Sequence, residues 1–98
     1  MSATSRKVAA MKGMLLSKGF VLRGKKHHEI YWFQIDGRIS RIHTFFSHGA
    51  KRYDRQLLAE VKRQIRLHNW DDFDNFMDCG MTSDQYRRKM LAEGHVIP

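Results

Sequence analysis

The dipeptide Asp36-Gly37, set between two runs of β-forming residues, most constrains how this 98-residue chain can fold. Residues 28–35 and 38–44 are both rich in aromatic and β-branched side chains. Asp-Gly readily adopts the positive φ angles that a two-residue hairpin turn requires. The sequence therefore predicts an antiparallel hairpin with its tip at these two residues.

A two-residue turn also predicts a register and two faces. The expected register pairs Ile35 with Arg38, Phe33 with Ser40, and Tyr31 with Ile42. Because successive strand side chains point to opposite faces, one face of the hairpin is apolar and is expected to join the core. Its members are Tyr31, Phe33, Ile35 and Ile42. The other face mixes aromatic, basic and imidazole groups, namely His28, Ile30, Trp32, Ile39, Arg41 and His43.

The segments on either side of the hairpin are expected to be a helix, a short strand and a loop. Helical spacing of apolar residues predicts a helix over 5–18, with Ser5 as its cap and Gly19 as its left-handed stop. Residues 20–22 are expected to form a short strand. Residues 45–53 are expected to form a loop.

Three further helices are expected after that loop. Asp54 is a suitable cap for a helix through Arg66. Its expected buried side consists of Leu57, Leu58, Val61 and Ile65. Asn69 is expected to cap a short helix, and Thr82 or Ser83 to begin the last one.

Composition is compatible with one domain. With 42% hydrophobic residues, the chain can bury a modest core, so we expect one α+β domain over residues 1–98. Its core would span about 5–67, with a three-stranded antiparallel sheet, and a short C-terminal helical extension would span about 69–93. The absence of a long apolar run and of a signal-peptide pattern predicts a cytoplasmic protein without membrane contact. A lone cysteine, Cys79, provides neither an internal disulfide nor a metal site by itself.

The charge is strongly positive and unevenly distributed. The formal net charge is +8, yet residues 1–66 hold 15 Lys and Arg against four Asp and Glu, whereas residues 67–98 hold three against six. A basic body with a mildly acidic tail predicts a polyanion-binding surface in the first two-thirds of the chain. A basic protein without such a partner is the alternative.

Two clusters combine imidazole with basic side chains. The first comprises Arg23, Lys25, Lys26, His27 and His28, and the second comprises Ser47, His48, Lys51 and Arg52. RNA carries its own nucleophile, the 2′-hydroxyl, so its cleavage needs proton transfer and charge stabilisation at phosphorus. Imidazole exchanges a proton near neutral pH, and lysine stabilises developing oxyanions. This chemistry predicts an RNA-cleaving site, with a partly exposed structural histidine pair as the alternative.

Several short motifs, taken in their order along the chain, resemble the HicA family of toxins. They are residues 16–31 (LSKGFVLRGKKHHEIY), 36–38 (DGR), 47–51 (SHGAK) and 78–86 (DCGMTSDQY). The resemblance covers about residues 7–90. It implies an α-β-β-β-α, double-stranded-RNA-binding-like fold that cuts mRNA without a metal or cofactor and is neutralised by a HicB-like antitoxin.

The resemblance also implies roles for particular residues. It favours His28 as the catalytic acid or base, with His27 second and His48 as its partner or as an RNA contact. Lys25, Lys26 and Lys51 would hold phosphate, together with Arg23, Ser47 and Arg52. In the register expected for the hairpin, His43 lies diagonal to His28, and it is a less supported substitute for His48. Lys25 and Lys26 stand where the family carries small residues, so a non-catalytic RNA-binding module of the same fold is the alternative.

Alternative interpretations remain for the open sheet face and for several other side chains. The open sheet face could instead bind a partner protein. Trp32 and Tyr31 could stack on bases or simply pack. His68 and His95 are expected to have no function. Adjacent strand residues point to opposite faces, so His27 and His28 are not expected to share a zinc ion, and no metal site is predicted.

Overall fold

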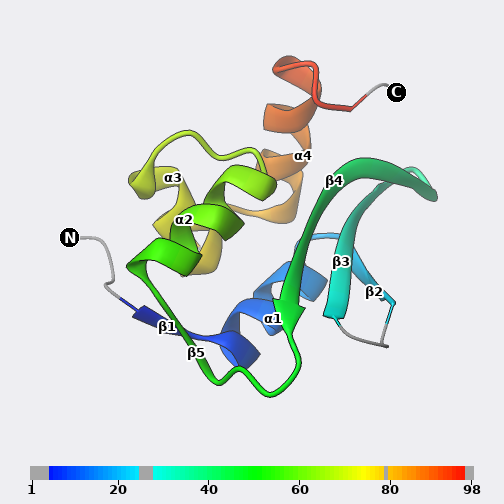
Figure 1. Cartoon of the computed structure of the whole chain (residues 1–98). Helices are drawn as coiled ribbons and strands as arrows, with labels where there is room; N and C mark the ends of the chain where they lie inside the picture. The colour runs from blue at the N-terminus through cyan, green and yellow to red at the C-terminus, as the bar shows by residue number, and fades with distance from the viewer. Residues whose placement is uncertain (1–4, 25–27, 79, 97–98) are drawn as a thin grey trace.

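The computed structural model describes residues 5–24, 28–78 and 80–96 (Figure 1). Within these residues the chain forms four helices and five strands. In chain order they are β1 (Ser5–Lys7), α1 (Val8–Ser17), β2 (Phe20–Arg23), β3 (His28–Ile35), β4 (Arg38–Ser47), β5 (Arg52–Asp54), α2 (Arg55–Gln64), α3 (Trp70–Met77) and α4 (Ser83–Ala92). The expected α+β class is therefore confirmed.

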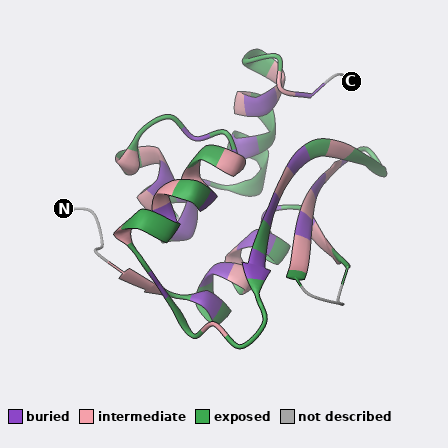
Figure 2. Cartoon of the chain, in the orientation of Figure 1, coloured by how far each residue is buried: buried purple, intermediate pink, exposed green. Residues whose placement is uncertain are grey.

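The strands form two antiparallel sheets. A three-stranded sheet has the order β2-β3-β4, as expected, and β1 pairs with β5 in a separate two-stranded sheet. The helices gather on one side of the three-stranded sheet, and buried residues concentrate between the two layers (Figures 1 and 2). No helix among the described residues covers the opposite face of this sheet (Figure 1).

The hairpin turn forms at the predicted residues. Asp36 and Gly37 have φ angles of 51° and 79°, the positive values that this turn type needs. Ile35 faces Arg38, as predicted.

The predicted register holds for the pairs Ile35–Arg38 and Gln34–Ile39 next to the turn and is wrong beyond them. Tyr31 pairs with Thr44 rather than with Ile42, because β4 places residues 40–42 opposite the single residue Phe33. The Ser40 hydroxyl stabilises this bulge: it donates to the Phe33 carbonyl at 2.7 Å and accepts from the Ile42 amide at 3.1 Å. The predicted faces survive, since a shift of two residues keeps the alternation of side chains.

The N-terminal segment is a strand rather than the start of a helix. Ser5 pairs with Asp54 in the β1-β5 sheet, so the prediction that it caps a helix is wrong. Lys7 occupies the cap position of α1 without a side-chain cap, and the Val8 amide donates to the Lys51 carbonyl at 2.9 Å. The local pattern missed this because the pairing partner, Asp54, is 49 residues away.

The loop expected over 45–53 is also partly wrong. β4 continues to Ser47, and β5 begins at Arg52, which leaves only residues 48–51 as a connection. Its turn is closed by a hydrogen bond from the Ala50 amide to the Ser47 carbonyl at 3.3 Å.

An ion-pair cluster holds β1 against α3. The Arg6 guanidinium contacts the Asp74 carboxylate at 2.7 Å and both oxygens of Asp78, at 2.7 and 3.1 Å. The hydrogen bond from Arg6 lowers the pKa of Asp78, whose side chain is largely exposed.

The caps predicted for the three later helices are confirmed, and of the two residues considered for the last helix it is Thr82 that caps it. The side chains of Asp54, Asn69 and Thr82 each accept a backbone amide in the first turn of α2, α3 and α4. Thr82 forms a full capping box with Gln85. Of the four residues expected to be buried in α2, Leu57 is exposed.

Tyr86 of α4 connects the C-terminal helices to the sheet. Its ring contacts those of Phe20, Phe33 and Phe76 at centroid distances of 5.8, 5.0 and 5.0 Å. Its hydroxyl donates to the Ile65 carbonyl at 2.8 Å. Helices α3 and α4 thus contribute to the same hydrophobic cluster as the sheet.

Candidate functional site

His28 lies at the base of the three-stranded sheet, with its side chain exposed. It begins β3 and pairs across strands with Ser47, the last residue of β4. Its imidazole contacts the edge of the Phe45 ring at a centroid distance of 5.2 Å. The ring is therefore open to a ligand on one side and positioned by an aromatic side chain on the other.

The turn that follows β4 places His48 next to this pair. Gly49 has a φ of +82°, a value that favours glycine, and completes the turn after His48. The turn is anchored to the core because the Ser47 amide donates to the hydroxyl of buried Tyr53 at 3.2 Å. The structure thus places Ser47 opposite His28 and the backbone of His48 directly after Ser47.

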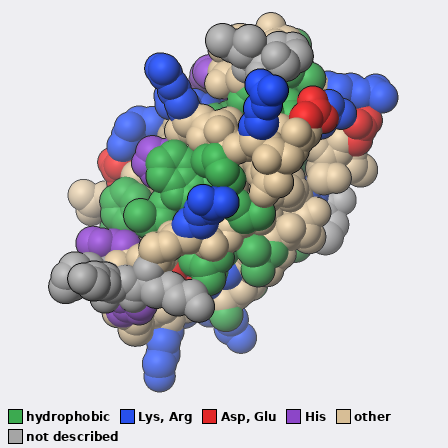
Figure 3. Space-filling model, turned by 90° about the vertical axis from the view of Figure 1, so that its right-hand side faces the viewer, with side chains coloured by type: hydrophobic (Ala, Val, Ile, Leu, Met, Phe, Trp, Pro, Cys, Tyr) green, Lys and Arg blue, Asp and Glu red, His purple; other side chains and the backbone are tan. Residues whose placement is uncertain are grey.

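The outward side chains of the three strands form an aromatic and basic surface, here called the open sheet face. Its members are Val21, Arg23, His28, Ile30, Trp32, Ile39, Arg41, His43 and Phe45. Phe45 is 41% exposed. Trp32 and His43 stack at a centroid distance of 4.2 Å. In Figure 3 a patch of hydrophobic side chains on this side of the molecule lies beside histidine and basic groups.

His43 does not lie beside His28. It pairs with Trp32, four residues along β3 from His28, which corresponds to about 13 Å. The expectation that His43 could substitute as a partner is therefore wrong, and the bulge is the reason. Tyr31, the other aromatic considered for base stacking, is buried in the core.

Lys51 and Arg52 belong to a second surface, on the side of α1. They line a cavity of about 460 Å³ at the N-terminus of that helix. The full lining is Lys7, Val8, Ala9, Lys12, Ala50, Lys51 and Arg52, and we call it the α1 pocket. Lys12 forms an ion pair with Glu29, and Arg52 donates to the Ser5 hydroxyl at 2.9 Å.

The predicted site residues thus fall into two groups. Arg23, His28 and Ser47 lie on the sheet, whereas Lys51 and Arg52 face the α1 pocket beyond the connecting turn. Among the described contacts, none joins Lys51 or Arg52 to His28. Lys25, Lys26 and His27 lie outside the described residues.

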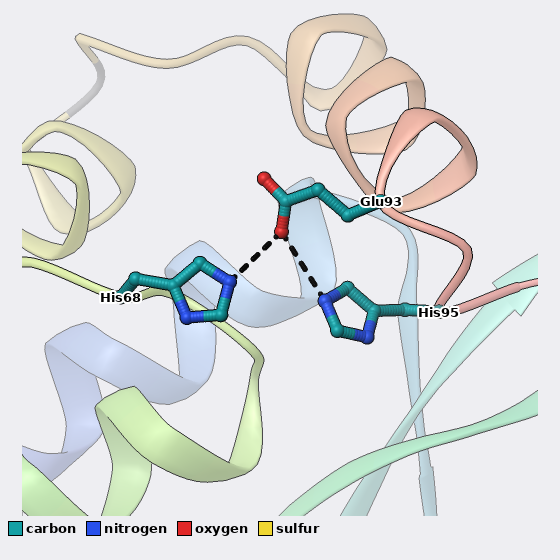
Figure 4. Close-up of side chains that lie close together, drawn as sticks. All are labelled: His68, Glu93 and His95. Carbon is teal, nitrogen blue, oxygen red and sulfur yellow. Dashed lines mark hydrogen bonds and ion pairs between the residues drawn. The ribbon is translucent and has the colours of Figure 1, made fainter.

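One cluster of functional groups was missed by the sequence analysis. His68 and His95, which were expected to have no function, both contact the Glu93 carboxylate (Figure 4). The three residues are far apart in the chain or on opposite sides of a helix end, so no spacing motif indicated the cluster. Only Gly94, a suitable helix stop, was a local signal that the chain reverses there.

Comparison with known proteins adds no evidence on the function of this chain. No protein-family model, curated protein or solved structure matches this chain. Within the described residues, every helix is too short or too polar to traverse a lipid bilayer.

Proposed function

We propose that this chain is a HicA-like endoribonuclease that cleaves mRNA by histidine acid–base catalysis. The observation that carries the proposal is the exposed imidazole of His28 at the base of the sheet, beside Ser47 and the turn that bears His48. An imidazole buried among apolar side chains could not reach a phosphodiester. Here it lies at the junction of an aromatic surface and a strongly basic part of the chain.

The order of elements supports the same proposal. Helix α1, strands β2, β3 and β4, and helix α2 follow one another as α-β-β-β-α, with both helices on one side of the sheet (Figure 1). This is the order that the resemblance implies for a double-stranded-RNA-binding-like fold. The additional strands β1 and β5 and the helices α3 and α4 would be elaborations of it.

The proposed reaction is a transesterification within the RNA strand. The 2′-hydroxyl oxygen attacks phosphorus while a base takes its proton, and the bond from phosphorus to the 5′ oxygen breaks as an acid protonates that oxygen. The products are a 2′,3′-cyclic phosphate and a free 5′-hydroxyl. His28 serves as one of the two proton-transfer groups, and His48 as the other.

Phosphate binding would come from the basic residues around this point. Arg23 is exposed at the end of β2, beside the first residues of β3. Lys51 and Arg52 in the α1 pocket would hold a neighbouring phosphate of the same strand, with Lys25 and Lys26 as further contacts. A HicB-like antitoxin would neutralise the protein by covering His28, and an mRNA substrate would place both proteins in the cytoplasm.

Cleavage by the His28→Ala variant tests the enzyme directly. The purified chain is incubated with end-labelled RNA in EDTA, and a substrate with 2′-deoxy residues serves as the chemical control. We expect at least a 100-fold loss of cleavage in His28→Ala, because general acid–base catalysis contributes factors of that order. Arg88→Ala, on the exposed surface of α4, is the matched control and should cleave normally. Equal cleavage by the His28 variant would refute the assignment.

The second candidate function is an RNA-binding module without turnover. The observation that favours it is the stack of Trp32 on His43 beside exposed Phe45, since such aromatic platforms bind unpaired bases. Intact RNA retarded by the protein, without cleavage, would support this module. Affinity that falls steeply with salt indicates phosphate contacts, and a salt-independent interaction would instead favour a protein-binding face.

A further inference from the structure

A carboxylate oxygen lies between two imidazole nitrogens at the C-terminal end of α4. The Oε1 atom of Glu93 is 3.0 Å from Nε2 of His68 and 3.2 Å from Nε2 of His95. All three ligand atoms lie within 4.8 Å of one another. Figure 4 shows both imidazole rings directed at the same oxygen. We propose that His68, Glu93 and His95 bind a divalent transition-metal ion, with zinc as the best-fitting one.

The spacing of these atoms suits a tetrahedral metal. Zinc binds imidazole nitrogen and carboxylate oxygen at about 2.0–2.2 Å, which separates neighbouring ligand atoms by about 3.4 Å. The two nitrogen-to-oxygen distances of 3.0 and 3.2 Å need only a small expansion to reach that value. Two imidazoles and one carboxylate favour zinc and its neighbours over magnesium or calcium, which prefer all-oxygen sites.

The backbone at the end of α4 holds two of the ligands in place. Gly94 has a φ of +76°, its amide donates to the Leu91 carbonyl at 3.2 Å, and the His95 amide donates to the Met90 carbonyl at 2.9 Å. These two bonds form a Schellman motif, which turns the chain back over the helix end. Buried Val96 then fixes the segment that follows. His95 is therefore presented to Glu93 by fixed backbone geometry.

The third ligand comes from a separate, equally anchored segment. His68 follows Leu67, which is buried and whose amide donates to the Lys62 carbonyl at 3.1 Å. The side chain of His68 is 66% exposed, so its ring can rotate onto an ion without disturbing the core. A bound metal would join the connection between α2 and α3 to the end of α4.

The charged side chains around the site influence its affinity for a metal ion. Lys89 contacts the other oxygen of Glu93 at 2.8 Å, so a bound metal ion would share this carboxylate with an ammonium group. The groove beside His68 and His95 is also lined by Lys62, Arg63 and Arg66. These cations oppose a divalent ion, and they favour water or a small anion as its fourth ligand.

Metal titration of the full chain tests this proposal independently of RNA cleavage. Protein prepared without a polyhistidine tag and stripped with EDTA is titrated with zinc by calorimetry and with cobalt by visible absorption. We expect one zinc ion per chain, a tetrahedral or five-coordinate cobalt spectrum, and no binding of magnesium. A zinc concentration 100-fold above Kd should raise Tm by at least about 5 °C.

Substitutions of the ligands distinguish this site from other histidines. His68→Ala and Glu93→Gln should each weaken zinc binding at least 10-fold, while the metal-free Tm of His68→Ala changes little because that side chain is exposed. His28→Ala is the matched histidine control and should leave zinc affinity unchanged. Absence of stoichiometric zinc binding would overturn the proposal, as would zinc binding that is lost in His28→Ala but retained in the ligand variants.

Discussion

The hydroxyl of Tyr86 provides a direct test of how α4 is attached to the rest of the fold. Tyr86 is fully buried, and burial raises the pKa of its hydroxyl well above the usual value, so the group remains a donor wherever the protein is folded. It satisfies the Ile65 carbonyl at the end of α2. The Tyr86→Phe variant keeps the ring and its three aromatic contacts and removes only this hydrogen bond.

The cost of the variant follows from the unpaired carbonyl. A buried polar group that loses its partner costs about 1–3 kcal/mol. For a domain of this size, each kcal/mol corresponds to a fall in Tm of about 4–8 °C. We therefore expect Tyr86→Phe to lower the free energy of unfolding by about 1.5 kcal/mol and Tm by roughly 6–12 °C, with the far-UV circular dichroism unchanged.

Chemical denaturation monitored by circular dichroism and fluorescence measures the effect. Tyr53→Phe is the matched control, because its hydroxyl accepts a longer bond of 3.2 Å from the Ser47 amide in an exposed turn, and it should cost less. A Tyr86→Phe variant within about 0.3 kcal/mol of the wild type would refute the assignment of this bond as a support of α4.

The remaining predictions concern the ion pairs, a cap and the bulge. The pKa of Asp78 is lowered by Arg6, so its ion pair stabilises the fold above the ordinary pKa of an aspartate and is lost as pH falls through the lowered value. Asp78→Asn should therefore be less stable than the wild type at pH 7 by about 0.2–1 kcal/mol. Urea titration at a series of pH values should show this difference disappearing at acidic pH, and a difference that persists there would contradict the ion pair as its cause. Thr82→Ala should cost about 1 kcal/mol through loss of the capping box, and an unchanged urea midpoint would contradict that role. Ser40→Ala should cost about 1 kcal/mol and increase amide exchange at Ile42, whereas unaltered exchange there would count against the hydroxyl as the support of the bulge.

Local signals in the sequence predicted the hairpin and the caps well. Asp36-Gly37 determines a turn by its own backbone preferences, and Asp54, Asn69 and Thr82 act on amides within one helical turn. Each of these interactions involves residues adjacent or nearly adjacent in the chain. These predictions therefore did not depend on contacts with distant parts of the chain.

The errors arose where distant residues decide the local structure. Ser5 is a residue type that often caps helices, but its backbone pairs instead with Asp54 of β5, 49 residues away. The register failed because a hydroxyl on β4, that of Ser40, stabilises two extra residues that no turn rule anticipates. Burial of Leu57 was overestimated since helical periodicity gives a face but not its width.

The candidate site was predicted only in part, because some of its residues are positioned by local structure and others by distant contacts. His28 and Ser47 meet because the strand directions force the ends of a long hairpin together. Lys51 and Arg52 turn toward α1 because β5 pairs with β1, a contact that the sequence did not reveal. The cluster of His68, Glu93 and His95 depends on how α4 packs, so it became visible only in three dimensions.

The bulge at residues 40–42 has a consequence for how this hairpin can change in length. Deleting one residue there would turn Phe46 outward and Phe45 inward, and every later side chain of β4 would exchange core for solvent. Deleting two would straighten the ribbon and preserve both surfaces. Insertions and deletions in β4 are therefore compatible with the fold only in steps of two residues. Which side chains reach the exposed surface thus depends on whether the number of residues added or removed is even or odd.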